Sequence, residues 1–210
     1  LDGYHSIVTS TYFAQFLPSD MPQLIPWSWN ASRTFLSVLM FGSWWMQMRE
    51  NRLGEAGRVN ERSVYIAGGV FTAASFIFFA FYPLPDAYYP NLIFGRPEEF
   101  VAGAFFLFAL VGYYQKSEWR TDWFDYWILI SLIIGFMGQT VYMSRSYEIF
   151  DLMFDAAHTL KIASYLCVLI GLFINYYHLF QRVESANKMI KERSELSILQ
   201  GKVGLRLTEH

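Results

Sequence analysis

The chain has 210 residues and a formal net charge of −2; 54% of its residues are hydrophobic, 20% are aromatic and only 16% are charged. Soluble domains carry about 25% charged residues, and the apolar residues here gather in long runs, so the composition is typical of an integral membrane protein. The sequence has no basic stripe for nucleic acid, and its single cysteine, Cys167, excludes an intrachain disulfide.

Five stretches are predicted to form membrane-spanning helices, because each supplies about 20 mostly apolar residues. In chain order they are residues 26–48, 64–82, 97–114, 124–143 and 154–180. Proline opens the first and the third, where its missing N–H costs nothing. The predicted fold class is therefore all-α, a polytopic transmembrane helical bundle.

Basic residues between these stretches predict which side of the membrane each segment occupies. Three segments that alternate correctly to share one side contain four, two and six basic residues: 49–62, 115–122 and 181–210. The opposite segments contain only Arg96 and Arg145. The C-terminal tail is therefore expected in the cytoplasm. Residues 1–25 are expected on the outer side, as the end of a preceding helix, with further helices before Leu1.

The predicted organisation has an outer-side segment at 1–25, a membrane-embedded bundle at 26–180 and a cytoplasmic helix at 181–210. Apolar residues where the last span meets this helix alternate by four, three and four positions: Leu179, Val183, Ala186 and Ile190. That spacing is typical of a coiled-coil seam and predicts a homodimer. The alternative is a solvated terminal helix.

Ionisable residues inside the predicted spans indicate a candidate site, because such residues are costly in a bilayer and usually face the bundle interior. In the predicted topology they all fall in the outer half of the membrane. The candidate ligand-binding residues are His5, Trp29, Arg33, Glu98, Glu99, Gln139, His158, Lys161 and Tyr165. The cations Arg33 and Lys161 balance Glu98 and Glu99, so we expect a carboxylate within salt-bridge reach of one of the two cations.

Each of these residues also has a purely structural explanation. Arg33 and Lys161 can reach the outer headgroups by snorkelling. Glu98 and Glu99 follow a proline in a first helical turn, where acids interact favourably with the helix dipole. His158 can be a hydrogen-bonded structural histidine.

Four short motifs occur in a fixed order: Tyr-His-Ser at 4–6, Trp-x-x-x-Arg at 29–33, an acid opening the helix at 97–114, and Ala-His-x-x-Lys at 157–161. In this order they resemble the third family of membrane-associated sensor (MASE) domains of bacterial signalling proteins. In that family the last motif usually begins with glycine, where this chain has Ala157, and an acid is expected where this chain has Gln139. The family's basic residue just before the third span's acid is expected to be absent here, with Pro97 nearby.

The resemblance implies a seven-helix module of the bacterial inner (cytoplasmic) membrane, with two helices missing before Leu1. It implies a sensory input domain that binds a small or lipophilic ligand near the outer face and has no catalytic activity of its own. The tail helix would lead to a cytoplasmic output domain of the histidine kinase, PAS or diguanylate cyclase type, the last of which makes cyclic di-GMP. Neither ligand nor cofactor is identified by the motifs.

Three other classes of function remain open. His5 and His158 could ligate haem or a metal in a redox protein. The chain could be an accessory subunit of a larger membrane complex. His158 with Glu98 or Glu99 could act as acid and base in an intramembrane enzyme, although the sequence offers no recognisable nucleophile motif.

Overall fold

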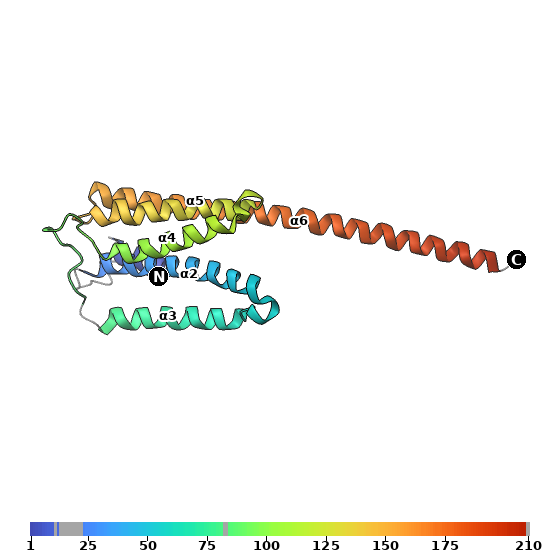
Figure 1. Cartoon of the computed structure of the whole chain (residues 1–210), viewed down its shortest axis with the longest axis horizontal. Coiled ribbons are helices and arrows are strands. Elements are labelled where there is room, and N and C mark those ends of the chain that lie inside the picture. Colours follow the sequence, from blue (N-terminus) through green and yellow to red (C-terminus); the bar gives the residue numbers. More distant parts are fainter. Residues whose placement is uncertain (11, 13–22, 82–83, 209–210) are drawn as a thin grey trace.

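The computed structural model describes residues 1–10, 12, 23–81 and 84–208, and these residues form helices without any strand. The α-helices are α1 (Asp2–Thr9), α2 (Leu24–Leu53), α3 (Glu61–Phe81), α4 (Glu99–Lys116), α5 (Trp123–Met137) and α6 (Leu152–Thr208) (Figure 1). Short 3-10 helices occupy Gly54–Gly57, Glu118–Arg120 and Met143–Arg145, and a π-helix occupies Gly138–Tyr142. The predicted all-α fold class is confirmed.

Side-chain caps fix where the last two long helices begin. Asp122 precedes α5, and its carboxylate accepts hydrogen bonds from the backbone N–H groups of Phe124 and Asp125 at 2.7 and 3.3 Å. Asp151 precedes α6, and its carboxylate accepts from the backbone N–H of Phe154 at 2.7 Å. Both acids satisfy backbone donors that lack a partner within the helix.

The core of the bundle lies between α2, α4, α5 and α6. Buried side chains of α4 and α5 form its centre: Phe106, Ala109, Tyr113, Ile128, Leu129 and Leu132. Gly112 of α4 is required for the contact with α2, because a Cβ atom there would lie 2.3 Å from the indole ring of Trp44. Close packing at this glycine brings the two helices together.

Helix α3 stands apart from this core. In Figure 1 it runs beside α2 but away from α4, α5 and α6. Its contact with α2 includes the stacked rings of Phe35 and Phe71, whose centroids lie 5.3 Å apart. Its other large side chains are mostly exposed, with Tyr65 79% exposed and Ile66 and Val70 also open. An isolated apolar helix of this kind was not predicted from the sequence.

Two helical segments among the described residues are long and apolar enough to cross a membrane, Trp123–Arg145 and Leu152–Arg193. The five predicted stretches overlap helices, so their helical character is confirmed in the described residues apart from Pro97 and Glu98, which form a turn before α4; only the last two stretches lie in segments that could cross a membrane. The last helix extends further than the predicted span. It continues without a break to Thr208 and projects far beyond the bundle (Figure 1).

Candidate functional site

The predicted site residues meet at one end of the bundle. This end of the bundle contains the first residues of α2, α4 and α6 and the last residues of α5. Helix α1 packs against α2 at the same end. In Figure 1 this is the left end, opposite the end from which α6 leaves the bundle. Helix α6 therefore connects the polar residues directly to the tail.

Lys161 of α6 pairs with a carboxylate outside the predicted set of site residues. Its Nζ lies 2.9 Å from Oδ1 of Asp2 in α1. Ser32 Oγ donates to the same carboxylate at 2.5 Å, and the Tyr165 hydroxyl donates to its second oxygen. Arg33 Nη1 donates to the Tyr165 hydroxyl oxygen at 3.3 Å. We call Asp2, Ser32, Arg33, Lys161 and Tyr165 the Asp2 network.

A second network surrounds Arg96, which is fully buried in the turn before α4. Its guanidinium forms ion pairs with Glu99 and, at 3.4 Å, with Glu98. Nη2 also donates to the Pro26 carbonyl oxygen at 3.0 Å. The Gln139 side-chain amide donates to the Glu99 carboxylate. We call Arg96, Glu98, Glu99, Gln139 and the Pro26 carbonyl the Arg96 network.

These pairings correct two expectations. The expected carboxylate for a site cation exists, but for Lys161 it is Asp2 and not Glu98 or Glu99, because Arg96 holds both glutamates. The expectation that no basic residue stands just before the third span's acid is wrong, because Arg96 lies three positions before Glu99 and pairs with it. Arg96 was counted only as a loop charge, since the predicted helix began at Pro97.

The π-helix at Gly138–Tyr142 ends α5 and brings side chains into the Arg96 network. It contains Gln139, which is buried, and it is followed by Met143, whose sulfur lies 2.9 Å from Arg96 Nη1. A π-turn adds a residue to the turn and so changes which side chains face inward. Such turns are frequent at functional sites.

Aromatic rings join the Asp2 network to the two histidines. The Trp29 indole lies 4.2 Å from the His158 ring and 5.6 Å from the His5 ring, measured between centroids. Lys161 Nζ lies 4.6 Å from the centre of the Trp29 ring, a cation–π distance. Phe154 covers His158 from the same helix at 4.1 Å. Trp29 therefore contacts both Lys161 and the two histidines.

The two histidines stack on each other, with ring centroids 5.8 Å apart. His5 Nδ1 lies 2.9 Å from Ser28 Oγ, and His158 Nδ1 lies 2.9 Å from the Phe154 carbonyl oxygen. Within the described part of the chain, no group of three or more His, Cys, Asp or Glu side chains is arranged to hold a metal ion. A haem or metal site would therefore depend on these two imidazoles.

Arg33 has an unusual environment for a buried cation. It is only 2% exposed, and its guanidinium carbon lies 5.0 Å from the ring centre of Phe106, 5.7 Å from that of Tyr165 and 5.9 Å from that of Trp29. Among the described residues no carboxylate oxygen lies within 4.0 Å of it, and its Nε has no hydrogen-bond partner. Three rings, not an acid, surround this charge.

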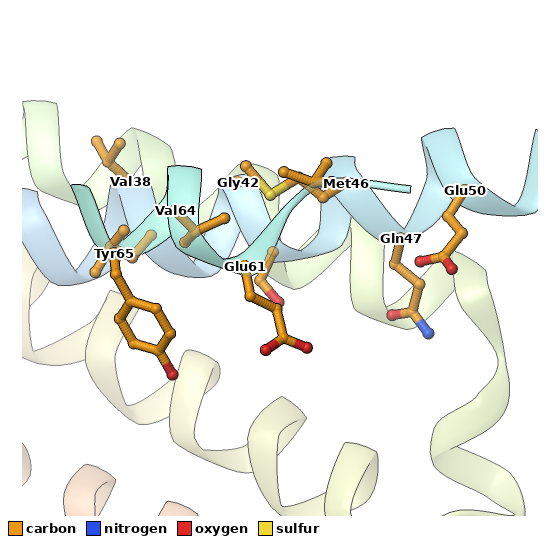
Figure 2. A pocket seen from close by; sticks show the side chains of 11 residues that line it. Val38, Gly42, Met46, Gln47, Glu50, Glu61, Val64 and Tyr65 are labelled. Atoms are coloured by element: carbon orange, nitrogen blue, oxygen red, sulfur yellow. The ribbon is translucent and has the colours of Figure 1, made fainter. Parts of the chain in front are cut away.

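Two hollows border helix α2 at different heights. A cleft of about 270 Å³ is lined by Leu36, Met40, Phe106, Ser131, Leu132, Tyr165, Val168, Leu169 and Leu172, and the Arg33 guanidinium lies beside two of these, Phe106 and Tyr165. A groove of about 710 Å³ separates α2 from α3 at the end from which α6 leaves. In Figure 2 the polar ends of Gln47, Glu50 and Glu61 point to the same side of this groove. It is remote from the predicted site.

A third charged cluster lies at the opposite end of the bundle. Lys116 Nζ is 2.5 Å from the Asp125 carboxylate and 2.7 Å from that of Glu118. Desolvation of Lys116 by itself lowers its pKa, but the hydrogen bonds to Asp125 and Glu118 outweigh it, so the net pKa is raised. This cluster joins α4 to α5 and is separate from the predicted site.

Comparison with protein-family models, curated proteins and solved structures finds no match to this chain. The class of protein is therefore defined by the fold and the site alone. The chain is an all-helical protein with two segments able to cross a membrane and with buried ionic networks at the end opposite its projecting helix.

Proposed function

We propose that this chain is the membrane-embedded sensory input domain of a bacterial signalling protein, as the resemblance to the third MASE family implies. The observation that carries the proposal is the course of α6. Its first turns contribute His158, Lys161 and Tyr165 to the buried site, and the same helix then continues out of the opposite end to Thr208. A ligand that changes contacts at the site acts on the helix that leads to an output domain.

The proposed topology has five spans and a cytoplasmic tail in the inner membrane. Trp123–Arg145 and Leu152–Arg193 supply two of them. Helices α2, α3 and α4 have 30, 21 and 18 residues and run in alternating directions (Figure 1). Even the 18 residues of α4 extend about 27 Å, close to the hydrocarbon thickness of about 30 Å. The distribution of basic residues supports the orientation.

The proposed mechanism is a shift between two positions of α6. A ligand can shift such an equilibrium only by its differential affinity for the two states. The contacts available for that difference are the pairing of Lys161 with Asp2 and the hydrogen bond of Tyr165 to the same carboxylate. Both link α6 to α1, so a ligand that competes for either contact changes how α6 is held.

The first experiment tests this link in the full-length protein with its native output domain. Lys161→Met leaves Asp2 without its cation and is expected to abolish ligand-dependent output while membrane insertion persists. Lys188→Met is the matched control, because Lys188 lies on the exposed part of α6. Normal regulation in Lys161→Met would contradict the proposal.

The second experiment tests the proposed homodimer, whose seam follows directly from the last span. Leu179, Val183 and Ile190 are all exposed in the single chain, so the seam is open to a second copy. Single cysteines introduced at position 183, 186 or 190 are expected to crosslink two copies of the chain more readily than Ser185→Cys. Position 185 points to a different side of the helix. Equal crosslinking at all four positions would leave the tail as a linker without a dimer seam.

A further inference from the structure

We propose that the cleft between α2 and α6 binds a single-chain amphiphile with a carboxylate head, such as a free fatty acid, with its head on Arg33 and its chain against α6. This inference deepens the proposed function, since it names the class of ligand that the sensor domain would recognise. It depends on the cleft, on the environment of Arg33 and on the pattern of the two helix faces that meet there.

The cleft has the lining that an alkyl chain requires. Its volume is about 270 Å³, and its walls are aliphatic or aromatic apart from Ser131 and the Tyr165 hydroxyl. Leu169 and Leu172 on its α6 side are 46% and 36% exposed, so the cleft is open at the side of the bundle. In a membrane this opening would face the acyl chains. The volume is slightly below the usual range of about 300–1,000 Å³ for ligand pockets, which suits one chain better than two.

Both helices that form the cleft change from polar to apolar along the same face. On α6 the residues spaced by three or four positions are His158, Lys161, Tyr165, Val168 and Leu172. On α2 the corresponding residues are Trp29, Arg33, Leu36 and Met40. Residues at these spacings share one side of a helix. The paired faces therefore present a polar end and an apolar end in the order that an amphiphile presents its head and its tail.

Arg33 lies where the polar part of these faces meets the cleft. Its guanidinium is beside Phe106 and Tyr165, and both of these rings also line the cleft. A guanidinium has five N–H donors, whereas the hydrogen bond of Arg33 within the described residues goes to the Tyr165 hydroxyl alone and Nε has no partner. The remaining donors of this buried cation, Nε above all, are thus left for an acceptor that the described residues do not supply.

The acids nearby are already held by other cations. Lys161 pairs with Asp2, while Arg96 pairs with Glu98 and Glu99. A carboxylate head can bind a guanidinium through two parallel hydrogen bonds, which is the strongest arrangement open to Arg33. An incoming carboxylate would also face the Tyr165 hydroxyl, which now donates to Asp2. Head-group binding would thereby compete for a contact that links α6 to α1.

The binding experiment uses the full chain in lipid nanodiscs and radiolabelled hexadecanoate as the probe. Unlabelled hexadecanoate is expected to displace the probe at concentrations at least tenfold lower than its methyl ester or a neutral short-chain quinone. Arg33→Gln should remove this preference, so that acid and ester compete equally. Equal competition by the ester or by the quinone in the unmodified protein would overturn the assignment of the carboxylate to Arg33.

Two tryptophan substitutions on α6 test the position of the chain. Leu169→Trp fills the cleft and is expected to reduce probe binding at least tenfold. Leu166→Trp is the control, because Leu166 is 52% exposed on the same helix and does not line the cleft, so its binding should be unchanged. Unchanged binding in Leu169→Trp, or equal losses in both variants, would overturn the location.

The outcome is separable from that of the proposed function. If hexadecanoate does not bind but Lys161→Met abolishes regulated output, the sensor proposal stands and the ligand inference fails. If hexadecanoate binds with the expected preference but output in Lys161→Met remains normal, the cleft is a lipid site and the sensor proposal fails.

Discussion

The Arg96 network offers the sharpest test of how this bundle is held together. Arg96 and Glu99 have fully buried side chains, and they form an ion pair between the turn before α4 and its first helical residue. Arg96→Met removes the cation and leaves the Glu99 carboxylate buried beside Gln139, without its ion-pair partner. The substitution also removes the hydrogen bond to the Pro26 carbonyl at the start of α2. The loss therefore affects α2, α4 and the π-helix together.

Breaking a buried ion pair by removing one partner costs about 3–5 kcal/mol, because the remaining charge stays in a poorly solvated position. For a chain of this length, about 1 kcal/mol corresponds to about 2–4 °C in Tm. We therefore expect Arg96→Met to lower Tm by about 6–20 °C. Glu99→Gln, which neutralises the acid, should also destabilise the protein. The free energy of unfolding lost in the double variant should be smaller than the sum of the losses in the two single variants. The difference, which is the coupling energy of the pair, should lie toward the upper part of the range of about 0.5–3 kcal/mol.

The assay is thermal and denaturant unfolding in one detergent, with Arg145→Met as the matched control. Arg145 is exposed at the same end of the bundle and rests against Phe94, 5.9 Å from the ring centre. Its removal should change stability by less than about 0.5 kcal/mol, as at most surface positions. Additive effects of Arg96→Met and Glu99→Gln would refute the reasoning, since they would mean that the buried pair is not energetically coupled.

Three further predictions concern other parts of the chain. Asp151→Ala should cost about 1 kcal/mol by removing the cap of α6. Burial by itself raises the pKa of Asp151, but backbone hydrogen bonds, that of Phe154 first, outweigh it and lower the pKa. The Asp151 carboxylate therefore stabilises the folded chain above its ordinary pKa of 3.8, and this stabilisation is lost as pH falls through the lowered pKa. Unfolding measured from pH 2 to 7 should show the free energies of the unmodified protein and Asp151→Ala converging at low pH. Gly112→Ala should destabilise by about 1–3 kcal/mol through contact with the Trp44 ring, and Trp44→Leu in the same chain should recover stability in thermal unfolding. Glu55→Cys in a Cys167→Ser background should react only with a cytoplasmic thiol reagent, and labelling from the outside would reverse the orientation.

Helix positions and the depth of the site residues could be predicted because both depend on local sequence. Long apolar runs require helices, and the place of Arg33, Gln139 or Lys161 along its helix sets the end of the bundle to which it belongs. The face of α6 that bears His158, Lys161 and Tyr165 followed from spacing alone. Long-range partners were not needed for these inferences.

The ionic partners could not be predicted because they depend on tertiary packing. Asp2 lies before the first predicted span, and nothing local indicates that α1 packs against α2 and reaches Lys161. One signal was present, since Asp2 and His5 are three positions apart and share a helix face. Arg96 was visible as a charge but was assigned to a loop, and only the fold places it against Pro26 and Met143. The separation of α3 from the core likewise has no sequence signal.

The two networks join different helices, and this difference bears on the proposed signalling. The Arg96 network joins α4 and the π-helix to the start of α2, with no residue from α6. The Asp2 network joins α6 to α1 and reaches α2 through Ser32 and Arg33. A change at Arg33 would therefore act on how α6 is held while the contacts between α2 and α4 remain intact. Since α6 is also the helix that leaves the bundle, the Asp2 network is the one joined to the proposed output, and the Arg96 network supports the helices against which α6 would move.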